Sequence, residues 1–183
     1  MERLDFPVGN AHIRFVVDGD TVGAEWIPSP LAAARGRQAR RARASAAPKA
    51  SASAHAHLIT QLVNAWMRGQ PISPARVSTL MPTRPEFFVA CWKACLRIPR
   101  GETRSYAWLA KAAGRPAAVR AAAQAMARNP LPLIVPCHRV TGTNDGGGFC
   151  GFGHMGDRSP RARRFLALKE ALLEMERPTS GRT

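Results

Sequence analysis

The sequence predicts an α+β protein built from a small sheet-containing part and a mostly helical part. Apolar residues in the segments 11–17 and 21–27 follow the pattern of strands, which places a sheet near the N-terminus. From residue 86 onwards apolar residues recur at helical spacing, which predicts helices. The proline-rich stretch 71–85 separates these regions and is typical of a linker. We therefore expect a small N-terminal α/β domain and a mostly helical, winged-helix-like C-terminal domain that bears a helix-turn-helix.

Length and composition are compatible with two small domains. A chain of 183 residues is long enough to bury a core, and we expect domains over 1–81 and 82–177 with a tail over 178–183. Acidic residues interrupt the apolar stretches of the N-terminus, and no apolar run approaches the ~20 residues needed to cross a bilayer. These features predict a cytoplasmic protein, which we expect to be a monomer.

The N-terminal domain is expected to contain a hairpin, a basic segment and a helix. Asp18-Gly19-Asp20 between the two strand-like segments predicts a hairpin turn. The segment 32–56 is rich in Ala, Arg and Ser and has little to bury, so it is interpreted as a flexible basic loop, with a solvated alanine-rich helix as the alternative. The apolar spacing from Leu58 to Trp66 then predicts a short amphipathic helix that ends near Gly69.

The first helix of the C-terminal domain is expected to bury two of the four cysteines. Thr83 and Glu86 have the spacing of a capping box, which predicts a helix start there. Cys91 and Cys95 fall on the apolar stripe of this helix, so we expect them to serve in packing. The cysteines have neither CxxC spacing nor accompanying His pairs, and a zinc site is therefore not expected.

Residues 105–128 are predicted to form the helix-turn-helix. The first helix begins near Ser105, Gly114 makes the turn, and Pro116 suits the first position of the second helix. Val119 belongs to the apolar residues expected on the inner face of that second helix.

A neighbouring face of the second helix has the composition of a nucleic-acid contact. Arg120, Gln124 and Arg128 are spaced four apart among alanines that include Ala121. Small residues beside a projecting arginine allow a helix to approach a groove closely. The net charge of +15 also favours a polyanionic partner. An ordinary alanine-rich surface helix is the alternative, and the pattern alone does not decide between the two.

The segment Pro136-Cys137-His138-Arg139-Val140 places a thiol beside an imidazole and a guanidinium, after the apolar run 131–135. A cysteine is a nucleophile only as the thiolate, and nearby positive groups lower the pKa of a thiol. The alternative is a small buried side chain followed by two solvated polar residues.

The last predicted helix carries an acid on its core-facing side. Phe165, Leu168 and Leu172 form an apolar stripe, and Glu176 follows Leu172 by four residues. A buried acid needs a partner. We expect His138 to be that partner, since a carboxylate would orient the ring and stabilise the imidazolium that forms when His138 takes a proton from Cys137. The alternative is a solvated glutamate in a fraying last turn.

From Pro85 to Glu176 the chain resembles the O6-alkylguanine-DNA alkyltransferases, also called methylated-DNA-protein-cysteine methyltransferases. The segments that carry the resemblance are, in order, Ile98–Thr103 with Ser105-Tyr106, Ala118–Arg120, Ala125-Met126, Asn129-Pro130, Pro136–Val140, and Lys169-Glu170 with Leu172-Leu173 and Glu176. Together they form an ordered set of matches, where each alone would be weak.

The resemblance implies a direct transfer of an alkyl group from guanine O6 in double-stranded DNA to Cys137. His138 and Glu176 would generate the thiolate, Tyr106 would help neutralise charge on the departing guanine, and Asn129 would hold the Cys137 loop. A thioether has no obvious route back to the thiol, so the protein would act once. Neither a metal nor an organic cofactor is expected.

The resemblance also assigns residues that hold the DNA and the base. Arg120 would fill the gap left by the extruded base, because the alkyl group is inaccessible while the guanine is stacked. The backbone carbonyls of Cys137 and Val140 would accept the exocyclic amine. The remaining residues expected at the substrate are Pro132, Cys150 and Gly151.

Two departures and two alternatives accompany the resemblance. Members of the family need only a handful of residues between Gly151 and the position of Lys169, whereas here residues 152–168 intervene, with arginines at 158, 161, 163 and 164. Cys150 falls where a small hydroxyl residue is common. The alternative functions are a DNA lesion sensor that transfers nothing and a helix-turn-helix transcriptional regulator.

Overall fold

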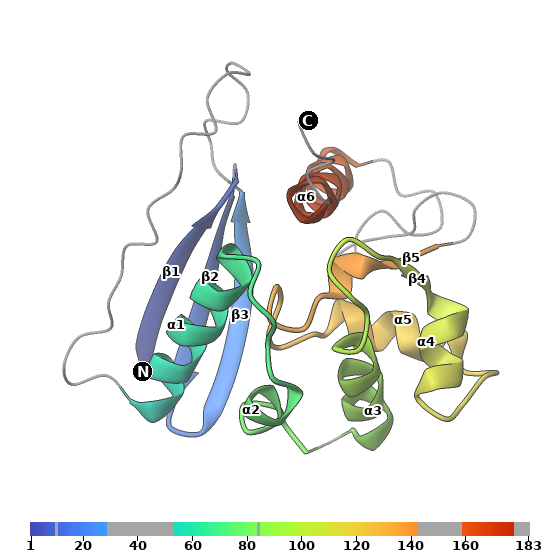
Figure 1. Cartoon of the computed structure of the whole chain (residues 1–183), viewed down its shortest axis with the longest axis horizontal. Coiled ribbons are helices and arrows are strands. Elements are labelled where there is room, and N and C mark those ends of the chain that lie inside the picture. The colour runs from blue at the N-terminus through green and yellow to red at the C-terminus, as the bar shows by residue number, and fades with distance from the viewer. Residues whose placement is uncertain (10, 29–52, 84, 143–158, 178–183) are drawn as a thin grey trace. The chain divides into compact units, whose positions relative to one another are not determined.

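The computed structural model describes residues 1–9, 11–28, 53–83, 85–142 and 159–177 (Figure 1). The chain forms two compact units. The first comprises Met1–Pro82 with Pro130–Ile134, and the second comprises Thr83–Asn129 with Val135–Thr183. The α+β class expected from the sequence is confirmed.

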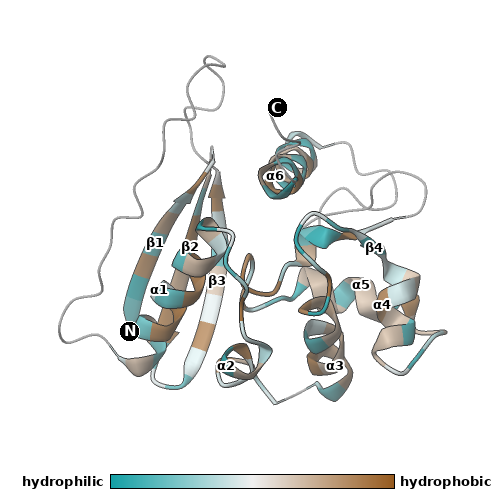
Figure 2. Ribbon diagram, in the orientation of Figure 1, coloured by the Kyte–Doolittle hydropathy of each residue, from teal (hydrophilic) through white to brown (hydrophobic). Residues whose placement is uncertain are grey.

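The first unit contains an antiparallel sheet whose strands follow chain order: β1 (Glu2–Val8), β2 (Ala11–Asp18) and β3 (Thr21–Pro28). The predicted hairpin is confirmed as β2 and β3, and Gly19 lies in its turn with a φ of 58°. Strand β1, which the sequence analysis did not predict, pairs with β2 so that Phe6 lies opposite Ile13. Polar and apolar residues alternate along these strands (Figure 2), and the apolar face is buried.

Helix α1 (Ala54–Met67) supplies the other layer of the first unit and packs against the sheet (Figure 1). The Ser53 hydroxyl caps its N-terminus by accepting a hydrogen bond from the Ala56 amide. The interpretation of 32–56 as a loop is therefore wrong for 54–56, because this cap starts the helix earlier than the apolar stripe does. Residues 29–52 lie outside the described residues. A short helix, α2 (Pro74–Ser78), follows.

The second unit combines helices with a short parallel strand pair. Its elements are α3 (Glu86–Cys95), β4 (Arg104–Ser105), α4 (Tyr106–Ala112), α5 (Val119–Ala127), the 3-10 turn η2 (Cys137–Arg139), β5 (Val140–Thr141) and α6 (Pro160–Glu176). Helix α3 packs against α4 and α5, and the Trp92 indole N–H donates to the Ala125 carbonyl at 2.8 Å. This bond ties the second helix of the helix-turn-helix to the core. Within the described residues no helix is long and apolar enough to span a membrane.

The start of α3 differs from the prediction. Pro85 is the N-cap of α3 and no side chain caps the helix, so the capping box of Thr83 with Glu86 is wrong. A proline fixes its own φ near the value that helix entry requires, and the helix begins without a hydroxyl cap.

The helix-turn-helix is present, but its second helix starts later than expected. Gly114 ends α4 with a φ of 84°, as predicted for the turn. Pro116 does not begin α5, because residues 115–118 form a further turn closed by the Ala118 amide on the Arg115 carbonyl at 2.9 Å. Val119, expected on the inner face, is 36% exposed, since the stripe that packs inward begins one turn later at Ala122.

Candidate active site

Cys137 lies in a buried turn between the segment 131–136 and strand β5. Strand β5 pairs with β4 in parallel, with Val140 opposite Arg104. Because the 3-10 turn η2 leads directly into β5, this pairing fixes the position of the turn that carries the thiol. The Cys137 residue is only 4% exposed. Burial raises the pKa of the Cys137 thiol above its ordinary value, while a hydrogen bond from Asn129 and the charge of Lys169 act in the opposite direction. The resting group is therefore a thiol, and a base is needed to make it a nucleophile.

Asn129 connects the end of α5 to the loop that carries Cys137. Its side-chain amide donates to the Val135 carbonyl at 2.8 Å, and the residue is 8% exposed. The side chain also hydrogen-bonds Cys137, which favours the thiolate. One buried amide thus fixes the backbone next to the thiol and lowers the pKa of the thiol.

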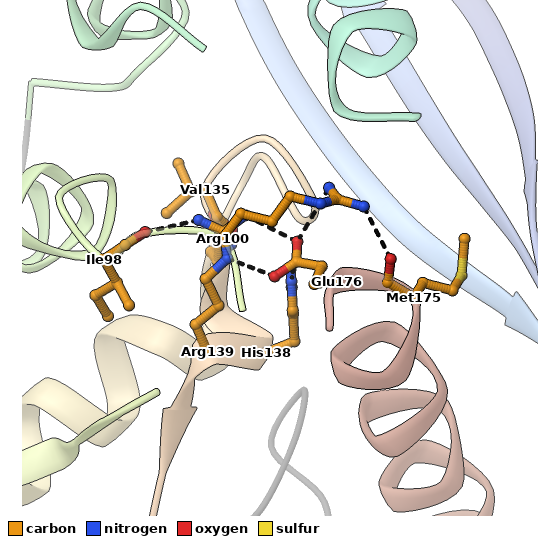
Figure 3. Close-up of polar contacts among 8 residues, drawn as sticks. Ile98, Arg100, Val135, His138, Arg139, Met175 and Glu176 are labelled. Atoms are coloured by element: carbon orange, nitrogen blue, oxygen red, sulfur yellow. Dashed lines mark hydrogen bonds and ion pairs between the residues drawn. The ribbon is translucent and has the colours of Figure 1, made fainter. Parts of the chain in front are cut away.

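His138 and Glu176 meet in the core of the second unit, as the stripe on the last helix predicted. His138 Nε2 lies 3.0 Å from Glu176 Oε1, and both side chains are fully buried (Figure 3). Burial alone would raise the pKa of Glu176, but hydrogen bonds from His138 and Arg139 outweigh it and hold that pKa well below its ordinary value. Glu176 is therefore ionised and can only accept hydrogen bonds.

The ionised carboxylate also decides the tautomer of His138. Because Glu176 only accepts, Nε2 of His138 carries the hydrogen and Nδ1 is the basic nitrogen. Burial lowers the pKa of His138 below its ordinary value, more than the interaction with Glu176 raises it. The ring is neutral at neutral pH, which is the state that a proton acceptor requires.

Arg139 is the second partner of Glu176, and the sequence analysis did not identify it. Its Nε lies 2.7 Å from Glu176 Oε2 and its Nη2 lies 2.8 Å from Oε1, while Nη1 donates to the Ile98 carbonyl at 2.7 Å (Figure 3). This is a two-pronged guanidinium-carboxylate pair in the interior. The signal was present, because an ionised carboxylate buried beside a neutral histidine requires a compensating charge, and Arg139 adjoins His138.

Lys169 is the other functional candidate for which the sequence analysis found no role. It is 3% exposed, and its ammonium donates to the Val140 carbonyl at 2.9 Å. Its spacing of four from Phe165 places it on the buried stripe of α6, and that spacing could have revealed it. A carbonyl oxygen has two lone pairs, so this bond by itself does not saturate the Val140 carbonyl.

The other cysteines of the described residues have the packing role expected for them. Cys91 and Cys95 are fully buried in α3. Burial raises the pKa of Cys91 to about 11 and that of Cys95 well above its ordinary value. Neither thiol is activated as a nucleophile at neutral pH.

The predicted DNA-contact residues lie on α5. Arg120, Gln124 and Arg128 are exposed and Ala121 is half-buried. The Arg128 guanidinium lies over the Phe88 ring at 5.6 Å, which anchors the last turn of this face to α3.

The remaining predicted site residues are less closely connected to Cys137. Tyr106 is half-buried at the first position of α4, directly after β4. Pro132 is buried and belongs to the first unit. Cys150 and Gly151 lie outside the described residues.

A family model supplies the identification. Residues 86–178, half of the chain, match the DNA-binding domain of 6-O-methylguanine DNA methyltransferase. The chain belongs to this family. The resemblance drawn from the sequence motifs is confirmed.

Relatives of the 6-O-methylguanine DNA methyltransferase family match over shorter stretches. A probable methylated-DNA-protein-cysteine methyltransferase of Acanthamoeba polyphaga mimivirus is 57% identical over 58 residues, which are 32% of this chain and 39% of the relative. The constitutive methylated-DNA-protein-cysteine methyltransferase of Bacillus subtilis is 62% identical over 53 residues, 29% of this chain and 32% of the relative. The chain thus spans about a third of the length of these curated relatives.

Solved structures match over nearly the whole chain. The crystal structure of Mycobacterium tuberculosis OGT in complex with DNA has a TM-score of 0.58 at 25% identity and covers 95% of this chain and 92% of its own. The O6-methylguanine-DNA methyltransferase of Pyrococcus kodakaraensis has a TM-score of 0.59 at 19% identity, over 95% of this chain and 97% of its own, and it shows the same fold.

Proposed function

We propose that this protein repairs DNA by moving a methyl or larger alkyl group from O6 of guanine to Cys137, once per molecule. The observation that carries the proposal is the buried contact between Glu176 and His138, the residue next to Cys137. Membership of the methyltransferase family supports it. No metal or organic cofactor takes part in the proposed reaction.

His138 acts as the base in the proposed first step. Nδ1 of the neutral ring takes the thiol proton, directly or through water, and Glu176 stabilises the imidazolium that results. The hydrogen bond from Asn129 and the charge of Lys169 stabilise the thiolate. Burial keeps these interactions strong because water does not screen them.

The second step is a direct displacement at the alkyl carbon. The Cys137 sulfur forms a bond to this carbon, the bond between carbon and O6 breaks, and its electron pair leaves with the guanine. Tyr106, at the start of α4, helps neutralise the charge on the departing base. The Cys137 and Val140 carbonyls receive the exocyclic amine, and the bond from Lys169 does not by itself saturate the Val140 carbonyl. The thioether product is stable, so the chain is consumed.

Helix α5 is the proposed DNA-binding element. Arg120 projects from its first turn beside the small Ala121, which suits close approach to a groove of double-stranded DNA. Arg120 occupies the space of the extruded base while the alkylated guanine enters the site. Gln124 and Arg128 extend the same face.

The proposed transfer is tested by intact-protein mass after incubation with duplex DNA that contains O6-methylguanine. The mass of the wild-type chain should rise by one methyl group in place of one hydrogen. Cys137→Ala should abolish the rise and keep DNA affinity, because only the nucleophile is removed. Cys91→Ala is the matched control at a buried packing thiol and should still accept the methyl group. Methylation of Cys137→Ala at another residue would contradict the assignment.

The same measurement separates the alternatives. A lesion sensor that transfers nothing, or a transcriptional regulator built on α4 and α5, would bind DNA without any change in mass. The buried His138 and Glu176 beside the thiol favour the transferase, because a regulator has no use for them.

A further inference from the structure

Arg100 spans the last turn of α6 from the loop that follows α3. Its Nη2 donates to the Met175 carbonyl at 3.0 Å, and its Nη1 lies 3.7 Å from Glu176 Oε1 (Figure 3). The Arg100 side chain is 32% exposed, whereas the Glu176 side chain is fully buried. One guanidinium at the edge of the core thus reaches both the backbone and the side chain at the end of this helix.

The last turn of α6 is held less firmly by the helix's own hydrogen bonds than the interior of the helix. Glu176 is the last residue of the helix, and the carbonyls of a last turn have no partner within the helix. Helix ends fray, and a guanidinium near the C-terminus is favourable both as a donor to these carbonyls and as a positive charge against the helix dipole. The Met175 carbonyl is such a group. Arg100 therefore ties down the peptide directly before Glu176.

The partners of Glu176 do not make Arg100 redundant. Arg139 holds the carboxylate itself with two hydrogen bonds, but it leaves the helix backbone untouched. Arg139 and His138 both come from η2, so they fix Glu176 from one side only. Arg100 comes from a different segment and acts on the α6 backbone. A further charged group near His138 is Lys169, which lies on α6 itself.

We propose that Arg100 is a positioning residue that holds Glu176, and through it His138, in place for activation of Cys137. This inference rests on the proposed alkyl transfer. Arg100 touches neither the thiol nor the imidazole in any contact given above, so its effect passes through the end of α6. Its loss should slow the chemical step and leave recognition of the base unchanged.

The test is the single-turnover reaction with free O6-benzylguanine, which requires no DNA contact. Arg100→Ala should lower the limiting rate constant about tenfold, the order expected when a hydrogen bond to a charged group is lost, with no change in the half-saturating concentration. Arg100→Lys should recover part of the rate, because an ammonium can still reach the Met175 carbonyl. Arg97→Ala is the matched control, since Arg97 donates to the Ala112 carbonyl at the end of α4 at 3.1 Å. It should react at the wild-type rate.

A double-mutant cycle decides whether Arg100 acts through Glu176. In a Glu176→Gln background, Arg100→Ala should slow the reaction no further, because the group that it positions is already gone. Independent, multiplicative losses would overturn the proposal, as would equal losses of rate in Arg100→Ala and Arg97→Ala.

A second readout separates this inference from the proposed function. The rate of Cys137 alkylation by iodoacetamide, followed by peptide mass, reports thiol activation without any alkylated guanine. It should fall in Arg100→Ala and stay unchanged in Arg97→Ala. If the wild-type chain accepts neither a methyl group from duplex DNA nor a benzyl group from the free base but this difference holds, the transferase assignment fails and the role of Arg100 stands. An unchanged alkylation rate in Arg100→Ala would overturn the role of Arg100.

Discussion

At the scale of single residues, Glu176 serves two partners whose requirements differ. Arg139 needs the carboxylate as a buried counter-ion, and His138 needs it as an acceptor that fixes the tautomer. Breaking a buried ion pair by removing one partner costs about 3–5 kcal/mol. That cost is a large fraction of the 5–15 kcal/mol by which a typical domain is stable. Variants at Arg139 therefore report on folding, and variants at His138 report more directly on thiol activation.

The same pair makes stability sensitive to acid. Burial lowers the pKa of His138 below its ordinary value of 6.5, so between the two pKa values the unfolded chain binds a proton that the folded chain does not. Stability is lost as the pH falls below about 6.5, by about 1.4 kcal/mol per pH unit for one proton. For Glu176, burial opposes but does not cancel the hydrogen bonds that lower its pKa, so its contribution is present above 4.5 and is lost in stronger acid.

We therefore expect the free energy of unfolding to fall between pH 7 and pH 5, and His138→Gln to reduce that fall. Urea unfolding at several pH values measures it. His12→Gln, at an exposed histidine on β2, is the comparison variant. A His138→Gln variant that keeps the full wild-type slope would assign the acid sensitivity to other groups.

At the scale of elements, α6 shows which features local sequence can predict. The pair Ser159-Pro160 is typical of a helix start, and the Ser159 hydroxyl does cap the helix by accepting from the Ala162 amide at 3.1 Å. Its stripe of apolar residues correctly predicted that Glu176 is buried. The third partner in the core, Arg139, was missed because only His138 was considered as the partner of Glu176, although an ionised carboxylate in the core also requires a compensating charge.

Helix α5 shows the opposite case. Its arginines lie on an exposed face, as predicted, but the predicted start of the helix was too early, because proline is common at the first position of a helix and Pro116 follows the turn at Gly114. The structure instead closes a turn on Arg115 before the helix begins. Helix propensity does not distinguish this turn from the first turn of a helix, since the same residues are compatible with both.

The exposed face of α5 gives a prediction about base extrusion. Arg120→Ala should lower transfer to duplex DNA about 10- to 100-fold, because the flipped state loses a stabilisation of a few kcal/mol when no side chain fills the vacated stack. Transfer from free O6-benzylguanine should barely change. Arg115→Ala removes the same charge from a residue that lies over the Phe87 ring instead, and it should affect duplex transfer much less. A parallel loss on the free base would show that Arg120 supports the fold or the thiol.

At the scale of the whole molecule, the two units differ in how far the sequence predicts them. The second unit carries a dense set of motifs, and its helices and its site follow from them. The first unit carries few. Strands β2 and β3 flank an obvious turn, but β1 contains Asp5 and Pro7, which are depleted in strands, so only its pairing with β2 in three dimensions reveals it. The segment 130–134 belongs to the first unit although it lies between α5 and the Cys137 turn, and no local pattern predicts that assignment.

The net charge of +15 is also a property of the whole molecule, and it leaves open which arginines contact phosphates. Arg161, Arg163 and Arg164 are exposed in the first turns of α6. Positive charge at a helix N-terminus opposes the helix dipole, so these side chains gain from a nearby anion. A general attraction of the charged molecule for DNA would not depend on where on its surface the arginines lie.

We expect that the arginines at the start of α6 contact phosphates. Replacing Arg161, Arg163 and Arg164 by Ala should weaken binding to all duplex sequences alike and flatten the log-log salt dependence by about 0.9 for each lost phosphate contact. The control variant replaces the exposed Arg3, Arg68 and Arg76 of the first unit, so that both variants carry +15 − 3 = +12. Duplex affinity measured at several salt concentrations compares them. An equal change of slope in the two variants would mean that total charge, and not the start of α6, sets the affinity.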